Sequence, residues 1–276
     1  FFSLHVSAMP SPGSPQPVAV LRGHSAAVNT LDFGEGGHEL ASGSADGEVR
    51  VWDVATRRTT CSTVAHGGLS VLAVHLLGRQ VCSQGRDGQI VRWDVSDGAW
   101  RETDSVAFTS YSFCRCALQQ HLVAMPMEEG KVVLHDFRSG QTAGCYEVGG
   151  TTKTGLLMYL DVVRAAAAQR DYVCAGYESG HLAIWDLGQE REPLYWEKLH
   201  NEPLLTNAWT HDGRYFGTGG ADNNFKLFQW ADNKATLQDT FEYSHGASCA
   251  SFRSDGRILA VGCWDYRVRL YDCRKR

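Results

Sequence analysis

Short runs in which apolar and polar residues alternate fill most of the chain. The first four runs span Ala26–Phe33, Glu39–Gly43, Glu48–Val54 and Thr59–Val64. Glycine, asparagine and aspartate separate the runs, and the third run alternates as a half-buried β-strand does. Almost no segment has the 3.6-residue period of an amphipathic helix. The pattern therefore predicts an all-β protein built from short strands and tight turns.

A six-residue interval recurs along these runs. A turn residue, usually aspartate, is followed six residues later by an aromatic residue or a histidine, and then usually by aspartate. The six turn residues are Asp46, Asp87, Glu129, Ser179, Asp222 and Asp265. They are separated by 41 to 50 residues. Because a repeat of about forty residues with this signature is typical of a four-stranded blade, the sequence predicts a β-propeller with six recognisable blades.

Other polar residues recur in register with the turns. Four histidines precede a turn aspartate by 20 to 22 residues, and a serine or threonine lies four residues before three of those aspartates. A carboxylate at a crowded turn needs donors, which imidazole, hydroxyl and indole groups supply. The pattern resembles the structural network of WD-repeat proteins. Its predicted members are His24, Ser42, Asp46 and Trp52 in repeat one, His66, Ser83, Asp87 and Trp93 in repeat two, His200, Thr218 and Asp222 in repeat five, and His245 and Asp265 in repeat six.

Repeats three and four lack a matching histidine, and their turns carry Glu129 and Ser179. We therefore expect these two blades to depend more on apolar packing and to be the softer part of the ring. Extra sequence before repeat four predicts surface-loop insertions at residues 149–155 and at Val163–Asp171.

Composition narrows the classes of partner. The net charge is −5 and the pI is about 6.1, so the chain has no basic footprint for direct binding of nucleic acid. No apolar run approaches the roughly 18–20 residues of a membrane span, so we expect no membrane partner. Nine cysteines, an odd number without a CxxC pair, predict reduced thiols of the cytosol or nucleus.

The sequence contains no recognisable catalytic set. The histidines and aspartates already belong to the predicted network, and neither HExxH nor GxSxG occurs. We therefore expect no enzyme, no catalytic residue, no metal and no cofactor, and instead a binding function carried by the loops at the faces of the ring. The residue before each turn position usually lies near such a face in WD-repeat proteins. The candidate partner-binding residues are Arg86, Glu128, Glu178 and Trp264.

Several segments are more distinctive than the generic repeat. They are Ser83-Gln84-Gly85-Arg86-Asp87, Asp104-Ser105-Val106, Phe113-Cys114-Arg115, Ala175-Gly176-Tyr177-Glu178-Ser179-Gly180, His200-Asn201-Glu202-Pro203 and Gly262-Cys263-Trp264-Asp265-Tyr266-Arg267-Val268-Arg269. Their order resembles the ASTRA-associated protein 1 family, also called guanine nucleotide-binding protein subunit beta-like protein 1. The resemblance implies a non-enzymatic adaptor of the nucleus and cytoplasm. It also implies protein partners in the ASTRA chromatin assembly, or in the Triple-T co-chaperone system that matures phosphatidylinositol-3-kinase-related kinases for DNA-damage signalling. Within such a hetero-complex we expect one copy of the chain.

Two alternative functions compete with this reading. Tyr271-Asp272-Cys273-Arg274 and His135-Asp136-Phe137-Arg138 echo the Trp-Asp-x-Arg pattern of cullin-RING ubiquitin ligase substrate receptors, although neither contains tryptophan. A heterotrimeric G-protein β subunit would need an N-terminal coiled coil, and the leader has no heptads.

The limits of the domain leave one point open. We expect residues 1–16 to be a disordered Pro/Ser-rich leader, with Met9 as the natural start, and residues 17–276 to form a single propeller domain. The family implies seven blades. Either a seventh repeat is missing, or Pro17–Leu21 completes repeat six and closes a six-bladed ring.

Overall fold

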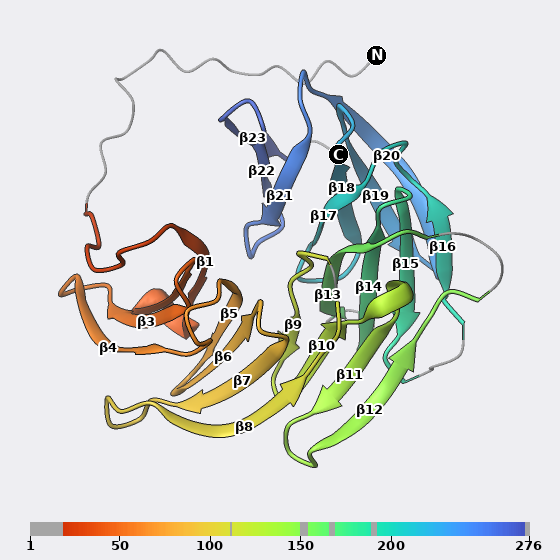
Figure 1. Ribbon diagram of the computed structural model, residues 1–276. Helices are drawn as coiled ribbons and strands as arrows, with labels where there is room; N and C mark the ends of the chain where they lie inside the picture. The colour runs from red at the N-terminus through yellow and green to blue at the C-terminus, as the bar shows by residue number, and fades with distance from the viewer. Residues whose placement is uncertain (1–18, 111, 150–153, 166–168, 189–191, 274–276) are drawn as a thin grey trace.

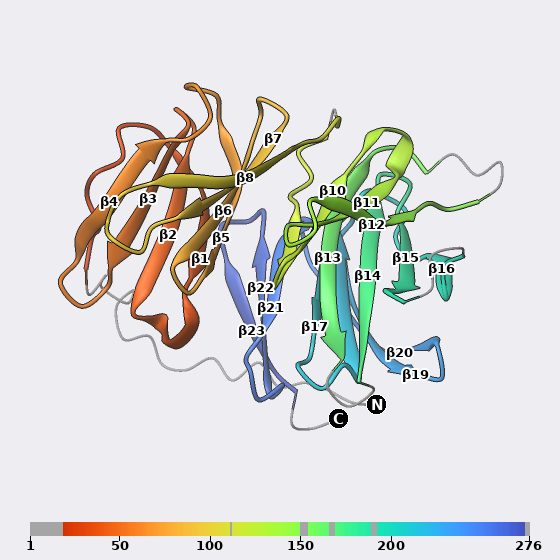
Figure 2. The same ribbon diagram turned by 90° about the horizontal axis from the view of Figure 1, so that it is seen from below.

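The protein folds into six antiparallel sheets arranged around a ring (Figure 1). The computed structural model describes residues 19–110, 112–149, 154–165, 169–188 and 192–273. In Figure 2 the strands of the first two sheets lie on one side of the molecule and those of the fourth and fifth sheets on the other. This is the six-bladed β-propeller that the repeat predicts.

The strands follow one another around the ring in chain order. The first sheet consists of β1 (Val28–Phe33), β2 (Glu39–Ser44), β3 (Glu48–Asp53) and β4 (Arg58–Val64). The second consists of β5 (Val71–Leu77), β6 (Gln80–Gly85), β7 (Gln89–Asp94) and β8 (Arg101–Ala107). The third consists of β9 (Ala117–Gln119), β10 (Leu122–Pro126), β11 (Val132–Asp136) and β12 (Gln141–Tyr146).

The remaining sheets continue this order. The fourth consists of β13 (Leu157–Ala165), β14 (Arg170–Tyr177), β15 (His181–Asp186) and β16 (Tyr195–Lys198). The fifth consists of β17 (Leu204–Trp209), β18 (Tyr215–Gly220), β19 (Asn224–Ala231) and β20 (Lys234–Glu242). The sixth consists of β21 (Ala247–Phe252), β22 (Ile258–Cys263) and β23 (Val268–Asp272). Two 3₁₀ helices, η1 (Glu35–Gly37) and η2 (Glu128–Gly130), complete the described elements.

Each turn residue of the repeat lies between the second and third strands of its sheet. In the first four sheets the next residue is a glycine with a positive φ, which is 84° at Gly47. Glycine adopts this left-handed conformation without the steric penalty of a Cβ atom. In the sixth sheet Tyr266 takes the same place with a φ of 62°. The six-residue interval of the sequence is therefore the distance from this turn to the aromatic residue near the end of the third strand.

The sixth sheet has three strands in the described part of the chain, whereas each of the other five has four. Residues 17 and 18 lie outside the described residues, as does the predicted leader, residues 1–16. Residues 19–21 form no strand. The described residues thus do not contain the ring closure that was one of the two predicted alternatives.

One predicted insertion is largely wrong. Val163–Asp171 was expected to form a surface loop, but β13 extends to Ala165 and β14 begins at Arg170. The two strands pair through this segment, and Val163 faces Tyr172. The apolar residues Val162 and Val163 are buried, which favours a longer hairpin over a loop. Of the other predicted insertion, residues 150–153 lie outside the described residues.

Apolar side chains fill the seams between neighbouring sheets. Val49 and Val51 of the first sheet pack with Val74 and Val81 of the second in one cluster of buried residues. Similar clusters join the later neighbours up to the fifth and sixth sheets. Neither short helix in the described residues is long or apolar enough to cross a membrane.

Candidate partner-binding surface

Five of the six sheets hold the residue before the turn position in the same way. Its backbone N–H donates to the carbonyl of the residue directly before the innermost strand, at 2.8–2.9 Å. The five donors are Ala45, Arg86, Glu178, Ala221 and Trp264. The shared hydrogen bond places four kinds of side chain, with alanine occurring twice, at five equivalent positions at one end of the sheets. The backbone frame is constant here and the side chain varies.

The third sheet departs from this frame. Glu128 begins the short helix η2, and Glu129 has a φ of 59°. The preceding Met127 N–H donates to the carbonyl of Lys131. Glu128 is therefore exposed at the same turn without the hydrogen bond that fixes its counterparts.

The four candidate binding residues predicted from sequence are all exposed. Trp264 retains 49% of its accessible surface, which is high for a large aromatic side chain. The Glu178 carboxylate already accepts a hydrogen bond from the Leu156 N–H at 3.1 Å. Exposure makes partner contact feasible at each position, and the binding role itself stays a prediction.

The second and fifth sheets contain the polar network as a continuous chain of hydrogen bonds. In the second sheet, His66 Nδ1 lies 2.9 Å from the Asp87 carboxylate, and its Nε2 lies 2.9 Å from the Ser83 hydroxyl. Ser83 Oγ also accepts a hydrogen bond from Trp93 Nε1 at 2.9 Å. Since the carboxylate can only accept, Nδ1 carries the proton and Nε2 accepts from serine. Every member has a partner within the fold, which leaves His66 without a free nitrogen for catalysis.

The fifth sheet repeats the chain without the indole. His200 contacts Asp222 at 2.9 Å and Thr218 at 3.0 Å, and Phe228 stands where tryptophan would. Burial lowers the pKa of His200 although the Asp222 carboxylate acts in the opposite direction. The imidazole is therefore neutral near pH 7 and serves as a hydrogen-bonding link.

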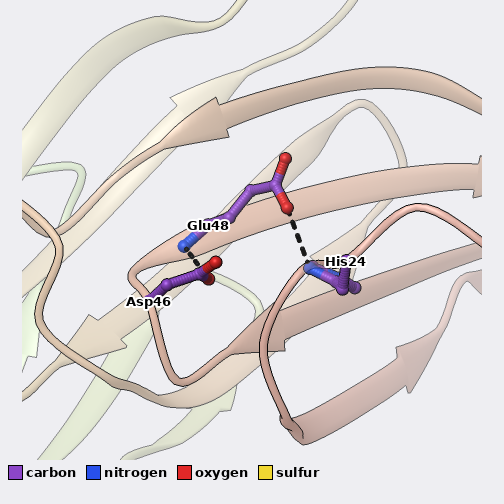
Figure 3. Close-up of side chains that lie close together, drawn as sticks. All are labelled: His24, Asp46 and Glu48. Carbon is purple, nitrogen blue, oxygen red and sulfur yellow. Dashed lines mark hydrogen bonds and ion pairs between the residues drawn. The ribbon is translucent and has the colours of Figure 1, made fainter.

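The first sheet differs from the prediction in its carboxylate (Figure 3). His24 Nε2 contacts Ser42 Oγ at 2.6 Å, and Trp52 Nε1 donates to the same oxygen at 2.8 Å. However, His24 Nδ1 lies 3.0 Å from Glu48 Oε2 rather than near an oxygen of Asp46. Glu48 lies two residues beyond Asp46, where the second and fifth sheets carry the neutral Gln89 and Asn224. The longer acidic side chain thus displaces the aspartate as the partner of the histidine.

Asp46 is instead bound by two hydroxyl groups. Ser25 donates to one carboxylate oxygen at 2.7 Å, and Ser44 donates to the other. These hydrogen bonds, that from Ser44 foremost, lower the pKa of Asp46 to about 2. Asp46 therefore caps its own turn, and its predicted contact with His24 is wrong.

His24, Asp46 and Glu48 also present ligand atoms within 4.8 Å of one another, as a metal site would require. The second oxygen of Glu48 is paired with Arg50 Nη2 at 2.7 Å. Both oxygens of Asp46 already accept hydrogen bonds. A bound cation would have to compete with a guanidinium and two hydroxyl groups, so the arrangement fits polar satisfaction better than metal binding.

The sixth sheet also departs from the predicted network. His245 is exposed and contacts the Ser244 hydroxyl at 3.0 Å rather than Asp265. Asp265 instead accepts two hydrogen bonds from the Arg269 guanidinium, at 2.7 and 3.0 Å. Val261 stands where the other networks have a hydroxyl group, so the network serine or threonine that would contact the histidine is missing. The bidentate arginine replaces the histidine as the partner of Asp265.

Aromatic packing replaces the network at the fourth sheet. Trp185, Tyr146 and Tyr177 are all fully buried, and the Trp185 indole N–H has no hydrogen-bond partner among the described residues. The residue that would accept from it, at the position of Ser83, is Ala175. Greater softness of repeats three and four stays a prediction.

The binding residues predicted from the sequence include Arg86 but not Phe113, the exposed residue on which the Arg86 guanidinium rests. Phe113 is 66% exposed, and the Arg86 guanidinium carbon lies 4.5 Å from the centre of its ring. Arg115 is exposed as well, while Cys114 and Cys116 on either side of it are buried. The signal was present in the sequence, since aromatic and basic residues alternate there with small apolar ones.

Comparisons with known proteins place the chain in a family. A family model described as WD domain, G-beta repeat matches residues 15–53 and 236–272. The mouse guanine nucleotide-binding protein subunit beta-like protein 1 is 30% identical over 278 residues, which cover 95% of this chain and 85% of the mouse protein. The chain belongs to this family of WD-repeat proteins. The predicted resemblance is thereby confirmed.

Two further comparisons agree with this assignment. ASTRA-associated protein 1 of Aspergillus niger is 24% identical, over 94% of this chain and 76% of that protein. The β-propeller domain of Cps50 (Swd1) from Myceliophteria thermophila has a TM-score of 0.75 at 19% identity, over 90% of this chain and 83% of that structure. The second likeness concerns the fold alone. The first, with the repeats, supports a scaffold or adaptor role.

Proposed function

We propose that the chain is a non-enzymatic scaffold that joins proteins in an ASTRA or Triple-T co-chaperone assembly. In this role it would assist the maturation of phosphatidylinositol-3-kinase-related kinases for DNA-damage signalling, in the nucleus and cytoplasm. The name of its fungal relatives, ASTRA-associated protein 1, supports the ASTRA context. Its partners are then proteins, and it acts as one copy within a hetero-complex.

The shared frame at the turns is the observation that carries this proposal. Five sheets hold an equivalent position by the same hydrogen bond, and the side chain there is alanine in two sheets and arginine, glutamate or tryptophan in the others. Such an arrangement suits recognition of a protein surface, because a rigid scaffold holds variable contact residues in a fixed geometry. The imidazoles of His66 and His200, by contrast, are occupied within their own sheets. Their occupation supports a structural rather than a catalytic use of the network.

Affinity purification with mass spectrometry tests the proposal. The tagged wild-type chain is expected to recover Triple-T components or related kinases. Trp264→Ala is expected to reduce this recovery while the unfolding free energy stays within about 0.5 kcal/mol of wild type, because the side chain is half exposed. The matched control is Tyr266→Ala, an exposed aromatic residue two positions away and outside the shared frame.

Recovery of cullin-linked adaptors alone would overturn the proposal in favour of the ubiquitin-ligase alternative. The arginine of one of the two sequence patterns that suggest this alternative, His135-Asp136-Phe137-Arg138, already forms an ion pair within the fold. Arg138 pairs with Asp136 of the same turn, with 3.4 Å between Nη2 and Oδ2. The other pattern ends at Arg274, outside the described residues.

A further inference from the structure

Arg86 and Phe113 form an exposed contact between the second and third sheets. The guanidinium carbon lies 4.5 Å from the ring centre, which is the geometry of a cation–π interaction. The side chains come from the turn after β6 and from the segment before β9. A guanidinium that rests on a ring keeps its N–H donors for other partners. The contact therefore orients a cation without neutralising it.

A chain of hydrogen bonds connects this contact to a second arginine. The Arg86 N–H donates to the Ser70 carbonyl at 2.9 Å, and Asn29 Nδ2 donates to the Ser70 hydroxyl at 2.7 Å. Arg115 Nη2 in turn donates to the Asn29 carbonyl at 2.9 Å. Leu69, which precedes Ser70, is 51% exposed. We call the exposed side chains of Leu69, Arg86, Phe113 and Arg115 the Arg86–Arg115 surface.

The backbone below this surface is fixed by a buried amide. Gln84 Nε2 donates to the Cys114 carbonyl at 3.1 Å, and Gln84 Oε1 accepts from the Cys116 N–H at 2.7 Å. The side chain thus pairs with the segment as a neighbouring strand would. Because Gln84 is fully buried, Phe113 and Arg115 extend from a held backbone. A preorganised contact loses less conformational entropy on binding.

Arg86 and Arg115 give this surface a positive charge. Neither Arg86 nor Arg115 takes part in an ion pair among the described residues, whereas Arg50, Arg253 and Arg269 do. The one carboxylate next in sequence, Asp87, is bound by His66. Two guanidinium groups that form no ion pair among the described residues lie beside two exposed apolar side chains, and together they are complementary to an anionic ligand that also carries an apolar group.

We propose that the Arg86–Arg115 surface binds an acidic segment of a partner protein. Its carboxylates accept hydrogen bonds from the two guanidinium groups, and a neighbouring apolar side chain packs on Phe113 and Leu69. This inference rests on the proposed scaffold function and names the chemistry of one of its partners. The opposite charge of Glu128 and Glu178 on the next two sheets favours basic residues further along the same segment.

Fluorescence polarisation with three labelled peptides tests the inference. The first alternates acidic with leucine residues, the second replaces each acid by its amide, and the third carries phosphoserine in place of the acids. The wild-type chain is expected to bind the first peptide at least about tenfold more tightly than the amide peptide, about 1.4 kcal/mol. The preference should weaken with added salt because both arginines are exposed.

Charge reversal localises the site. Arg86→Glu is expected to weaken binding of the acidic peptide about tenfold or more, and Arg115→Gln to weaken it by a smaller factor. Arg58→Glu is the matched control, because Arg58 is an exposed arginine on β4, the outer strand of the first sheet, and forms no ion pair with any residue that the structure describes. An unchanged unfolding curve for each variant separates loss of binding from loss of fold.

Three results would overturn the inference: equal binding of the acidic and amide peptides, equal weakening by Arg86→Glu and Arg58→Glu, or Arg86-dependent binding of the phosphopeptide alone. The last result would replace carboxylate by phosphate as the ligand. Because these peptides are defined, their failure leaves the purification experiment interpretable, and failure of the purification leaves the peptide result standing.

Discussion

The second and fourth sheets solve the same structural problem with opposite chemistry. In the second, Trp93 donates to Ser83, which contacts His66, which contacts Asp87. In the fourth, the position of Ser83 is Ala175, and the equivalent tryptophan is fully buried, with no partner for its indole N–H in the described part of the chain. The strand register around the tryptophan is the same in both, since Val81 pairs with Trp93 and Val173 with Trp185.

The difference shows that the blade geometry does not require the polar network. The fourth sheet reaches the same register through apolar packing, with Tyr146 and Tyr177 buried beside Trp185. The hydroxyls of Tyr146, from the third sheet, and Tyr177, from the fourth, donate to the carbonyls of Leu187 and Gly130 and so remain satisfied. The network is one way to stabilise a blade, and its histidines and aspartates need no further function to explain their presence.

The largest expected effect in this comparison is the loss of the aromatic core. Trp185→Ala is expected to lower the unfolding free energy by about 3–5 kcal/mol, because it leaves a cavity in a fully buried cluster. Chemical denaturation followed by circular dichroism measures it. The control Trp264→Ala removes an exposed tryptophan and should stay within about 0.5 kcal/mol of wild type. Equal losses from both variants would contradict the account.

A smaller effect is expected from the polar network. His66→Ala should lower the unfolding free energy by about 1–3 kcal/mol, because Ser83 and Asp87 each lose a partner in a buried or half-buried place. His245→Ala, in the sixth sheet, removes an exposed histidine whose ring contacts the Ser244 hydroxyl, and it should be nearly neutral. The same denaturation experiment shows whether losing the histidine costs more unfolding free energy in the second sheet, where the network is complete, than in the sixth, where it is not.

The smallest expected effect is a gain in stability when a network hydroxyl group is added to the fourth sheet. Ala175→Ser places a hydroxyl where the second sheet has Ser83, within the same register as the unpaired Trp185 N–H. We expect a gain of up to about 1 kcal/mol in unfolding free energy from the new hydrogen bond. The gain should disappear in the Trp185→Phe background, which has no N–H to donate. A loss of stability in both backgrounds would mean that the site cannot accommodate the hydroxyl.

The repeat allowed the fold to be predicted from sequence in some detail. The interval from Asp87 to Trp93 located a turn and a strand end, and alternation located the strands around it. The longer hairpin of β13 and β14 escaped prediction, because Arg164 and a run of alanines resemble a loop more than a strand. Pairing across that hairpin is a tertiary effect that local pattern does not contain.

The network partners were only partly predictable, for a different reason. The spacing of the repeat identified His24 and Asp46 as network residues but did not identify Glu48. The Glu48 carboxylate lies beside the histidine only in the folded strand. Likewise the bidentate pair of Arg269 with Asp265 depends on two residues four apart across a hairpin turn. The Arg86–Phe113 contact joins two sheets, and no spacing rule relates its residues.

The network residues stabilise the fold, whereas the proposed role of the Arg86–Arg115 surface is to bind partners. This division of roles can be tested. One paired measurement tests it: the unfolding free energy and the affinity for the acidic peptide, both determined for His200→Ala and for Arg86→Glu. We expect His200→Ala to lower the unfolding free energy by about 1–3 kcal/mol and to leave peptide affinity unchanged under native conditions. Arg86→Glu should do the reverse. If His200→Ala, still folded, weakens peptide binding as much as Arg86→Glu does, the separation of fold from function is contradicted.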